Sequence, residues 1–431
     1  MSPPREPMAL DTLTARFRQY LHLPDRGPLV VVLAVAIANL MAGDPTWLLV
    51  IGGPSSGKSE MLNALRGRPG THEMSTATVA GFLSGSSVKE GDDRATGGVL
   101  SQIAKSPNRY GLVLVKDLTT LLSGAAETRD AVFGFMREVF DGSVTRALGT
   151  EGGRVFKWAG KVGVIAAVTG AIDLVDMGLL GDRYLYLRYP VPSPEDARAI
   201  GERVLANSGR EKEMRGSLAD AAGAFIDGLG IDPAAPPPAL DGADQDRLID
   251  LATLAVRCRS AVVFRGADLE LLPASEEAPR LLGELNRVAG AMTAMGVEAG
   301  EMWHLLGELA TGGVHRDRFA ALVFLAGSFS PSTFRTTATV AGNIRRPMAP
   351  TLRHLQALQA LGLVESEGSE HDTSERWCAS DWTISLWPSF SGVPVREGHP
   401  VSAEVVKTEA EAVTNVGAAF ALDPFDVEET S

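Results

Sequence analysis

The sequence has few of the features that mark secreted, metal-cluster or membrane-spanning proteins. Two cysteines, Cys258 and Cys378, occur in 431 residues and lie too far apart for a metal-ligand motif, so we expect free thiols in a reducing, cytoplasmic compartment. The most apolar run, residues 29–42, is shorter than the roughly 20 residues of a membrane span. It predicts a buried helix, and no membrane partner is expected.

Positive charge is also scarce. The chain has 40 lysines and arginines against 53 aspartates and glutamates, which gives a formal net charge of -13. This balance excludes a general affinity for nucleic acid, so any contact with DNA has to come from a local basic patch. The length is enough for two or three domains, each with its own core.

Strand-like and helix-like segments alternate over residues 28–190. Continuous apolar runs at Trp47–Ile51 and Tyr110–Val115 are typical of fully buried strands. Similar runs at residues 162–168 and 184–189 predict two more strands, and residues 72–74 a short one. Because strands that alternate with helices form parallel sheets covered on both faces, the predicted fold class is α/β.

The loop after the first buried strand fits a phosphate-binding pattern at every fixed position. It reads Gly52, Gly53, Pro54, Ser55, Ser56, Gly57, Lys58 and Ser59, and a predicted helix follows it. Glycines let backbone N–H groups turn toward phosphate oxygens. We expect Lys58 to reach the β- and γ-phosphates, the Ser59 hydroxyl to bind Mg²⁺, and Glu60 to adjoin the nucleotide. The loop therefore predicts binding of ATP, or a similar nucleoside triphosphate, with Mg²⁺.

A carboxylate is expected at the end of the strand Tyr110–Val115, and Asp117 is the candidate. It is either the carboxylate on the magnesium side, displaced by one position, or it takes the position of a catalytic glutamate. In the second interpretation Lys116 stands where an aspartate is usual. A surface acid at a strand end is the third alternative. Each interpretation leaves a single acid here, so the sequence does not predict fast hydrolysis.

Residues 142–160 have the pattern of a β-hairpin, with the strand Ser143–Leu148, a glycine-rich turn and a second strand from Arg154. With the phosphate loop, this arrangement resembles AAA+ ATPases over residues 28–300. The greatest resemblance is to the branch of phage-type superfamily III and minichromosome maintenance helicases. Their hairpin grips DNA in a central pore, which implies DNA contacts for Arg146, Arg154 and Lys157. A structural hairpin with a solvated face is the alternative.

The same resemblance implies roles for three more residues. Thr169, at a strand tip, is similar to the sensor that orients the attacking water, and a plain strand-end threonine is the alternative. Arg183 is similar to an arginine finger that acts on a neighbouring subunit. Arg280 is similar to a second sensor that reaches the nucleotide from a helical lid. Surface arginines are the alternatives for both. The resemblance implies a homo-oligomeric ring, such as a hexamer.

The C-terminal part resembles a winged helix-turn-helix domain. Helices are predicted at residues 319–326, Thr337–Ile344 and 349–361, and strands follow at residues 363–365 and 382–385. The third helix would enter a DNA groove in such a domain.

Polar side chains around the third helix are the candidates for DNA contact. They are Arg345, Arg346, Thr351, Arg353, His354 and Gln356. The two leading arginines are expected to hold the phosphate backbone and the others to face base edges or phosphates. Acidic residues in the wing, such as Glu365 and Glu367, oppose phosphate binding, so a protein-interaction module is the alternative.

These patterns predict five regions. They are an N-terminal helical extension (1–27), a P-loop AAA+ core (28–190), a helical lid (191–300), a winged helix-turn-helix domain (301–386) and an acidic tail predicted to be disordered (387–431). The function predicted is that of an oligomeric ATPase acting on DNA, helicase-like or translocating. The alternative is an ATP-binding switch with weak hydrolysis, whose winged helix recruits DNA or a protein.

Overall fold

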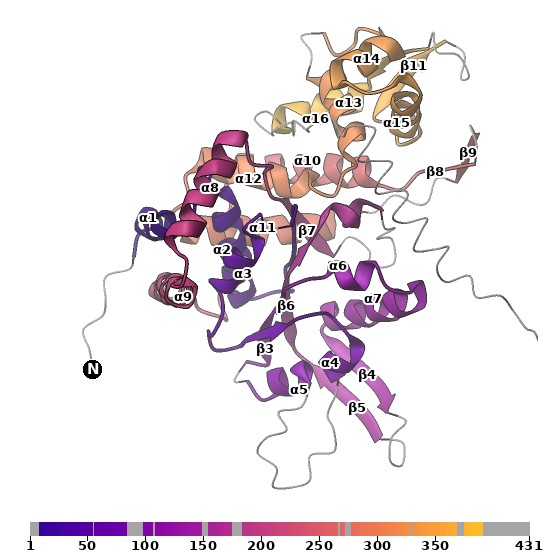
Figure 1. The fold of residues 1–431 in the computed structure, drawn as a ribbon. Helices are drawn as coiled ribbons and strands as arrows, with labels where there is room; N and C mark the ends of the chain where they lie inside the picture. The colour runs from indigo at the N-terminus through magenta and orange to yellow at the C-terminus, as the bar shows by residue number, and fades with distance from the viewer. Residues whose placement is uncertain are drawn as a thin grey trace, which may run out of the picture.

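A parallel β-sheet surrounded by helices forms the centre of the molecule in the computed structural model (Figure 1). The structure describes residues 8–54, 56–83, 98–106, 108–148, 154–174, 183–265, 268–271, 277–327, 330–368 and 375–390. Ser55, one of the predicted phosphate-loop residues, and residues 391–431 of the predicted tail lie outside them.

The sheet has five strands in the order β2-β3-β6-β1-β7, and every neighbouring pair is parallel. The bounds are Trp47–Ile51 for β1, Thr71–Met74 for β2, Tyr110–Val115 for β3, Lys161–Val168 for β6 and Tyr184–Arg188 for β7. The runs of β1, β3 and β6 are apolar because these strands are buried on both faces. The predicted α/β class is confirmed.

Two hydrophobic clusters cover the two faces of the sheet. Leu48 and Val50 of β1 join a cluster with α2 (Gly27–Leu40) and α3 (Lys58–Asn63). Trp47 and Leu49 point the other way, toward α4 (Val79–Leu83), α5 (Val99–Ala104), α6 (Thr119–Leu122) and α7 (Ala126–Phe140). Helix α2 is apolar all round and buried along nearly its whole length, as a helix inside a core has to be.

A two-stranded hairpin leaves the core between α7 and β6. It consists of β4 (Ser143–Leu148) and β5 (Arg154–Ala159), at the predicted places. Val144 and Trp158 are a cross-strand pair, and both are buried. These two residues fix which face of the hairpin lies on the body.

Helices follow the sheet. They are α8 (Pro194–Ala206), α9 (Glu211–Gly228), α10 (Gly242–Arg259), α11 (Pro279–Ala294) and α12 (Ala299–Thr311), with a small hairpin of β8 (Val263–Arg265) and β9 (Asp268–Leu271). The N-terminal helix α1 (Leu10–Tyr20) packs on α9, α11 packs on α2, and α12 packs on β7 as well as on α10 and α11. The helical region and the sheet therefore share one core.

A C-terminal unit, residues 316–390, completes the described chain. Its elements are α13 (Arg316–Ala326), β10 (Arg335–Thr336), α14 (Thr337–Ile344), α15 (Met348–Ala360), β11 (Val364–Glu367), β12 (Arg376–Ala379), α16 (Asp381–Leu386) and the 3-10 helix η3 (Trp387–Phe390). Its three strands pair in the order β10-β12-β11.

The predicted strand at residues 382–385 is wrong, because these residues form α16. The alternation of Trp382, Ile384 and Leu386 imitates a strand. Ser380 favours a helix, because its side chain accepts a hydrogen bond from the backbone N–H of Thr383 and so caps the helix N-terminus. The strand that completes the small sheet is β12, which lies just before this cap.

The C-terminal unit is attached to α10 at three places. The Arg318 guanidinium donates to the carbonyl oxygens of Cys258 and Ser260 at the end of α10. Arg257 of α10 lies over the Trp382 ring at 4.8 Å, and the Ser389 hydroxyl donates to Asp250. A cation at the last carbonyls of a helix is favoured by the helix dipole. Helix α10 and the C-terminal unit are therefore tied together by polar contacts as well as by packing.

Candidate phosphate-binding site

The predicted phosphate loop lies where β1 ends and α3 begins. Gly57 has a φ of +90°, a conformation that L side chains rarely adopt. At Gly52 an added Cβ would lie 2.8 Å from the Cβ of Tyr189, so only glycine fits. Gly53 has open space around it. Because the loop follows the last residue of β1, and β1 is parallel to its neighbours β6 and β7, the loop lies at the carboxyl edge of the sheet, where ligands of open α/β sheets bind.

The Lys58 side chain bends back across this loop. Its ammonium donates to the carbonyl oxygens of Gly52 at 2.8 Å and Gly53 at 2.5 Å, and to the Ser56 hydroxyl at 3.2 Å. Burial lowers the pKa of Lys58, while the charge of Asp117 opposes that shift. A buried cation is thus held within the loop, close enough to Asp117 to sense its charge. Ser59, the predicted Mg²⁺ ligand, follows Lys58 in the first turn of α3 and is exposed.

Asp117 belongs to a hydrogen-bonded group that joins the ends of β3 and β6. Its carboxylate accepts the backbone N–H of Thr119 at 2.8 Å. The Thr119 hydroxyl accepts the backbone N–H of Thr169 at 3.1 Å, and the two threonine hydroxyls are 3.4 Å apart. The predicted sensor Thr169 therefore lies beside the predicted acid. Thr119 links these two residues. In the sequence, its position just after Asp117 was the only indication of this role.

Lys116 does not belong to this group. Its ammonium pairs with Glu73 of β2 at 2.9 Å, and Glu73 also accepts from Arg66. These contacts hold the pKa of Glu73 below its usual value despite its burial. Asp117 is consequently the acid that the end of β3 contributes to this edge of the sheet. Both of its proposed roles stay predictions.

Glu60 has a partner in the helical region. Its carboxylate accepts from the Arg215 guanidinium of α9 at 2.7 Å. The ion pair connects the first turn of α3, directly after the phosphate loop, to α9. A nucleotide contact of Glu60 stays a prediction, and its side chain is engaged with α9.

Arg188 and Asp173 are a pair at this edge that the sequence reasoning missed. Arg188 is the last residue of β7 and lies opposite Ile51, the residue before the phosphate loop. Its guanidinium binds Asp173, in the 3-10 helix η1 (Gly170–Leu174) after Thr169, at 2.7 and 2.5 Å. It also donates to the Gly312 carbonyl oxygen at 3.0 Å. The edge that carries the loop is thus connected to the segment between α12 and the C-terminal unit.

Arg183 lies at the opposite edge of the sheet. Tyr184, the next residue, pairs with Trp47 at the start of β1. The five residues from Arg183 to the level of the phosphate loop span roughly 16 Å at strand spacing. The Arg183 guanidinium donates to Asp141 at 3.3 Å and lies over the Phe140 ring at 5.5 Å. It is therefore remote from the phosphate loop of its own chain.

Arg280 lies close enough to Arg183 for its charge to act on it. The pKa of Arg183 is lowered by burial, and by the neighbouring charges of Arg280 and Arg137, against the effect of Asp141. In the same helix as Arg280, Arg287 donates to the Thr46 hydroxyl just before β1. A contact of Arg280 with the nucleotide stays a prediction.

The predicted basic hairpin is divided between two faces. Arg146 pairs with Glu138 of α7 at 2.6 Å and lies over the Phe135 ring at 5.7 Å. Lys157 pairs in register with Thr145, the position before Arg146, so it faces the other way, and it is exposed. The side chain of Arg154 lies outside the described part. Arg146 and Lys157 do not form one basic face, because neighbouring strand residues alternate.

In the C-terminal unit, Thr351 was predicted to be exposed and is buried instead. Its hydroxyl donates to the Pro347 carbonyl oxygen one turn earlier. Arg346 is engaged by Asp317 at 2.9 Å. Arg345 and Arg353 are exposed. A contact of either residue with DNA stays a prediction.

His354 packs on a second histidine. Its ring centroid is 4.4 Å from that of His315. Burial, together with the charge of His315, lowers the pKa of His354 to about 4, against the effect of Asp317. A half-buried neutral imidazole, packed on the ring of His315, is poorly placed to contact phosphate. Gln356 is half-buried.

The Mg²⁺ ligands that the sequence suggests are a hydroxyl and a carboxylate. Within the described ranges no three His, Cys, Asp or Glu side chains gather as a metal site. Magnesium at nucleotide phosphates is held by one or two carboxylates or hydroxyls, waters and the phosphates themselves. Ser59 and Asp117 are exposed on the same edge of the sheet and fit that donor set.

None of the helices in the described part is long and apolar enough to cross a membrane. Comparison of the sequence with known proteins finds no match, either to a protein-family model or to a curated protein.

Proposed function

We propose that this chain binds ATP with Mg²⁺ and hydrolyses it as an AAA+ type ATPase that acts on DNA. The observation that carries the proposal is the loop after β1. A glycine-rich turn holds the ammonium of Lys58 against the carbonyls of Gly52 and Gly53, at the carboxyl edge of a parallel sheet. A buried cation surrounded by backbone is suited to bind phosphate oxygens.

Each side chain around the loop has its own role in the proposed reaction. Lys58 stabilises charge on the β- and γ-phosphates, which is the main resource in phosphoryl transfer. Ser59 and Asp117 hold Mg²⁺, which when bound neutralises charge on the same phosphates. Thr169, fixed by Thr119, orients the attacking water. The hydrogen bond from Thr119 keeps Asp117 in place for this task.

Arg183 completes the site in a second copy of the chain. It cannot reach its own phosphate loop, because β7 separates them, and it lies beside Arg280 and Arg137. A cluster of arginines at one end of a subunit can meet the γ-phosphate held by a neighbour. The chain therefore works as a homo-oligomer.

Contact with DNA is assigned to the C-terminal unit and the hairpin. The order helix, strand, helix, helix, strand, strand in residues 316–379 supports a winged helix-turn-helix. Arg345 and Arg353 are exposed arginines around α15, and Lys157 is an exposed cation in the described part of the hairpin. These cations are local exceptions in an acidic chain.

One observation favours the second candidate, an ATP-binding switch with weak hydrolysis. Lys116 occupies the first position after β3 and is tied to Glu73, so Asp117 is left without an adjoining acid. In this case nucleotide binding alone controls recruitment of DNA or a protein by the C-terminal unit.

Titration of ATP in Mg²⁺, followed by measurement of phosphate release with and without DNA, tests the proposal. The ATPase is supported if ATP binds and DNA raises turnover. Binding without turnover in any condition selects the switch. Absence of triphosphate binding overturns both.

A further inference from the structure

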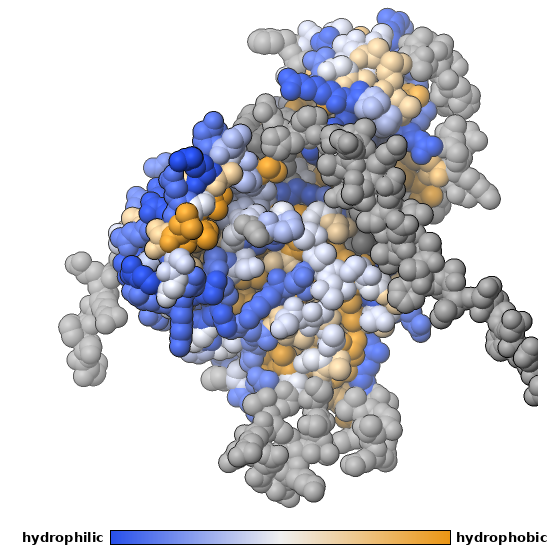
Figure 2. All heavy atoms as spheres, viewed as in Figure 1, coloured by the Kyte–Doolittle hydropathy of each residue, from blue (hydrophilic) through white to orange (hydrophobic). Residues whose placement is uncertain are grey.

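The C-terminal unit, residues 316–390, forms a lobe that stands out from the rest of the molecule (Figure 2). Helices α10 and α12 lie between this unit and the sheet (Figure 1). Helix α12 ends at Thr311 and α13 of the unit begins at Arg316, so residues 312–315 join the two helices. A displacement at the end of α12 therefore reaches the C-terminal unit over a few residues of backbone.

Arg188 fixes the end of α12 to the edge of the sheet that carries the phosphate loop. Its guanidinium donates to the Gly312 carbonyl oxygen at 3.0 Å and to both carboxylate oxygens of Asp173. Gly312 packs so closely on β7 that an added Cβ would collide with the Tyr186 carbonyl oxygen. Partial burial lowers the pKa of His315, and the charges of Asp173 and Arg188 act on this pKa in opposite directions. The ion pair thus lies close to the start of α13 as well as to the end of α12.

Asp173 is joined to residues that the proposed function places at the nucleotide. It lies in η1, which begins directly after Thr169, and the backbone N–H of Thr169 donates to the Thr119 hydroxyl. Arg188 is itself paired with Ile51, the residue before the phosphate loop. A triphosphate that displaces Thr169 therefore also displaces η1 and the carboxylate that Arg188 holds.

The start of α13 is in turn connected to α15. His315 is the N-cap of α13, and its ring centroid lies 4.4 Å from that of His354 in α15. Asp317, in the first turn of α13, binds Arg346 in the turn before α15 at 2.9 Å. Both contacts end at the helix that the proposed function places at DNA.

We propose that Arg188 couples the nucleotide site to the C-terminal unit, so that a bound triphosphate changes the affinity of this unit for DNA. The inference rests on the proposed function, because it takes ATP as the ligand of the loop after β1 and DNA as that of the C-terminal unit. An arginine that binds both oxygens of a carboxylate requires a fixed geometry. The Arg188–Asp173 pair therefore opens when η1 shifts, and the contact of Arg188 with Gly312 changes with it. Coupling of this kind is a difference in contacts between two states, and it acts equally in both directions.

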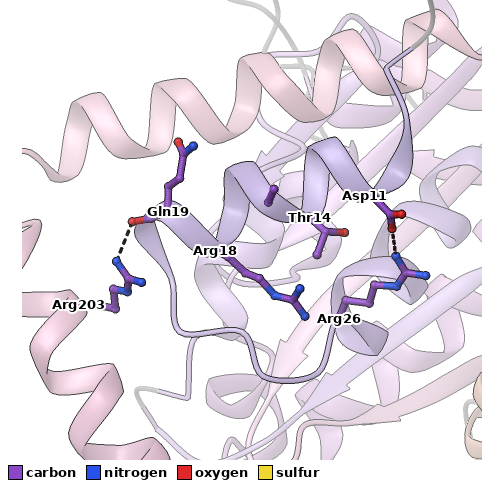
Figure 3. Close-up of a pocket in the computed structure, with 7 residues that line it drawn as sticks. Asp11, Thr14, Arg18, Gln19, Arg26 and Arg203 are labelled. Atoms are coloured by element: carbon purple, nitrogen blue, oxygen red, sulfur yellow. Dashed lines mark hydrogen bonds and ion pairs between the residues drawn. The ribbon is translucent and has the colours of Figure 1, made fainter.

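Arg26 offers a matched control at the other end of α12. Its guanidinium binds both carboxylate oxygens of Glu301 in the first turn of that helix, at 2.8 and 2.6 Å, and it also binds Asp11 (Figure 3). The side chains of Arg26 and Arg188 are both 23% exposed. Removal of either guanidinium frees one end of α12, but of the two residues it is Arg188 that connects this helix to η1.

The first test measures the coupling with two ligands. A non-hydrolysable ATP analogue with Mg²⁺ and a fluorescent DNA duplex are titrated separately and together. For the parent and Arg26→Gln, we expect the analogue to change the dissociation constant of DNA by about five-fold or more, and DNA to change that of the analogue by the same factor. For Arg188→Gln and Asp173→Asn, we expect both factors to approach one, while each ligand alone binds as it does to the parent. Asp173 is 50% exposed, so its replacement by asparagine opens the same ion pair without disturbing the core.

Equal factors in the parent and in Arg188→Gln or Asp173→Asn overturn the coupling, and so does a parent whose two ligands bind independently. A loss of coupling in Arg26→Gln as large as that in Arg188→Gln also overturns it, because loosening of either end of α12 would then suffice. A parent that does not bind the analogue in the absence of DNA contradicts the proposed function, and the inference falls with it.

The second test, hydrogen exchange followed by mass spectrometry, detects the coupling without DNA. In the parent and Arg26→Gln, the analogue should change the exchange of backbone amides in the phosphate loop and also in residues 312–326 and 346–360. In Arg188→Gln the change in the loop should remain, and that in the C-terminal unit should disappear. A change in the C-terminal unit that persists in Arg188→Gln overturns the proposal, whereas a parent without any change in the loop speaks against nucleotide binding itself.

Discussion

At the scale of single residues, the site depends on how a cation is kept inside a loop of backbone. Lys58 is buried and makes its hydrogen bonds to groups of the loop itself. Its lowered pKa reflects that burial, and Asp117 is the acid whose charge offsets it. A triphosphate provides stronger negative partners than carbonyl oxygens, so phosphate binding and the geometry of this lysine are coupled.

Replacement of Lys58 by alanine is expected to remove triphosphate binding or turnover and to leave the fold intact. Turnover should fall by about 10²-fold or more, as for other charge-stabilising donors. Equilibrium titration with ATP and a phosphate-release assay measure the effect, and Lys116→Ala, which removes a lysine paired with Glu73, is the matched control. Unchanged affinity and turnover in Lys58→Ala contradict the assignment of the loop.

Replacement of Asp117 by asparagine is expected to reduce turnover more than binding. The amide still accepts the Thr119 N–H but loses the charge that holds Mg²⁺ or polarises water. We expect turnover to fall by about 10²-fold, with ATP affinity in Mg²⁺ changed less. A variant that turns over at the parent rate places the essential carboxylate elsewhere.

The histidine pair predicts a pH dependence of stability. The folded-state pKa of His354 is lowered to about 4 by burial, with His315, Arg318 and Arg346 adding to the shift and Asp317 opposing it. The folded-state pKa is below the unfolded value of about 6.5. The contribution of the neutral His354 to the free energy of unfolding is therefore fully present above pH 6.5. It is lost as the pH falls from there toward 4.

Urea unfolding at several pH values between 7 and 4.5 measures this loss. We expect a smaller decrease of the unfolding midpoint for His354→Gln than for the parent chain. His304→Gln, which changes an exposed histidine of α12, should behave as the parent does. If the midpoint falls by the same amount on the acid side in all three proteins, the lowered pKa of His354 is contradicted.

At the scale of elements, the hairpin β4–β5 carries one cation that is paired with the body, Arg146, and one that faces solvent, Lys157. Val144 and Trp158 pack its inner face on the body. On that side Arg146 binds Glu138, while Lys157 and the 52% exposed Val155 face solvent. Electrostatic binding of DNA requires cations that can release counterions at phosphates, so Lys157 is the better candidate.

We expect Lys157→Ala to lower the slope of log affinity for DNA against log salt concentration by about one, the effect of one lost phosphate contact. Arg146→Ala should leave the slope unchanged and reduce stability by less than about 1 kcal/mol, as for other half-exposed ion pairs. Fluorescence anisotropy at several salt concentrations measures both. A reversed order of the two variants contradicts the division of the hairpin into two faces.

At the scale of the whole molecule, the loop and Arg183 lie at opposite edges of one sheet. Tyr184 pairs with Trp47 where β1 begins, and Arg188 pairs with Ile51 where it ends. Arg280 and Arg137 share the Arg183 edge. A single chain therefore carries the two parts of the proposed site at opposite ends of the strands, which is the arrangement that the proposed homo-oligomer requires of a head-to-tail assembly.

Mixing of Arg183→Ala with Lys58→Ala subunits tests this arrangement. Each variant alone should be inactive, because an arginine finger contributes about 10³–10⁵ in rate. In the mixture some interfaces join an intact loop to an intact Arg183, and partial turnover should return. Turnover is measured after mass spectrometry has shown that mixed oligomers form. Mixed oligomers without activity, or full activity of a strict monomer, contradict the trans-acting role.

The sequence predicted local features well and side-chain environments less well. The runs Trp47–Ile51, Tyr110–Val115 and Thr337–Ile344 match the observed elements residue for residue, because burial on both faces or one face leaves a pattern in the chain. The strand predicted at residues 382–385 was wrong, since three alternating apolar residues fit a strand or a capped helix equally. The predicted exposure of Thr351 was also wrong, because the helical period places this side chain on the inner face of its helix, where it is buried.

The sequence by itself determined where the predicted phosphate loop lies, since a buried strand, a glycine-rich turn and a helix follow one another at fixed spacing in the chain. Only the tertiary structure decided which distant groups meet. It brought Thr119 to Thr169 and Arg280 near Arg183. The reason is that such contacts depend on strand order and helix direction, which are set by packing of the whole core and leave no short-range pattern in the chain.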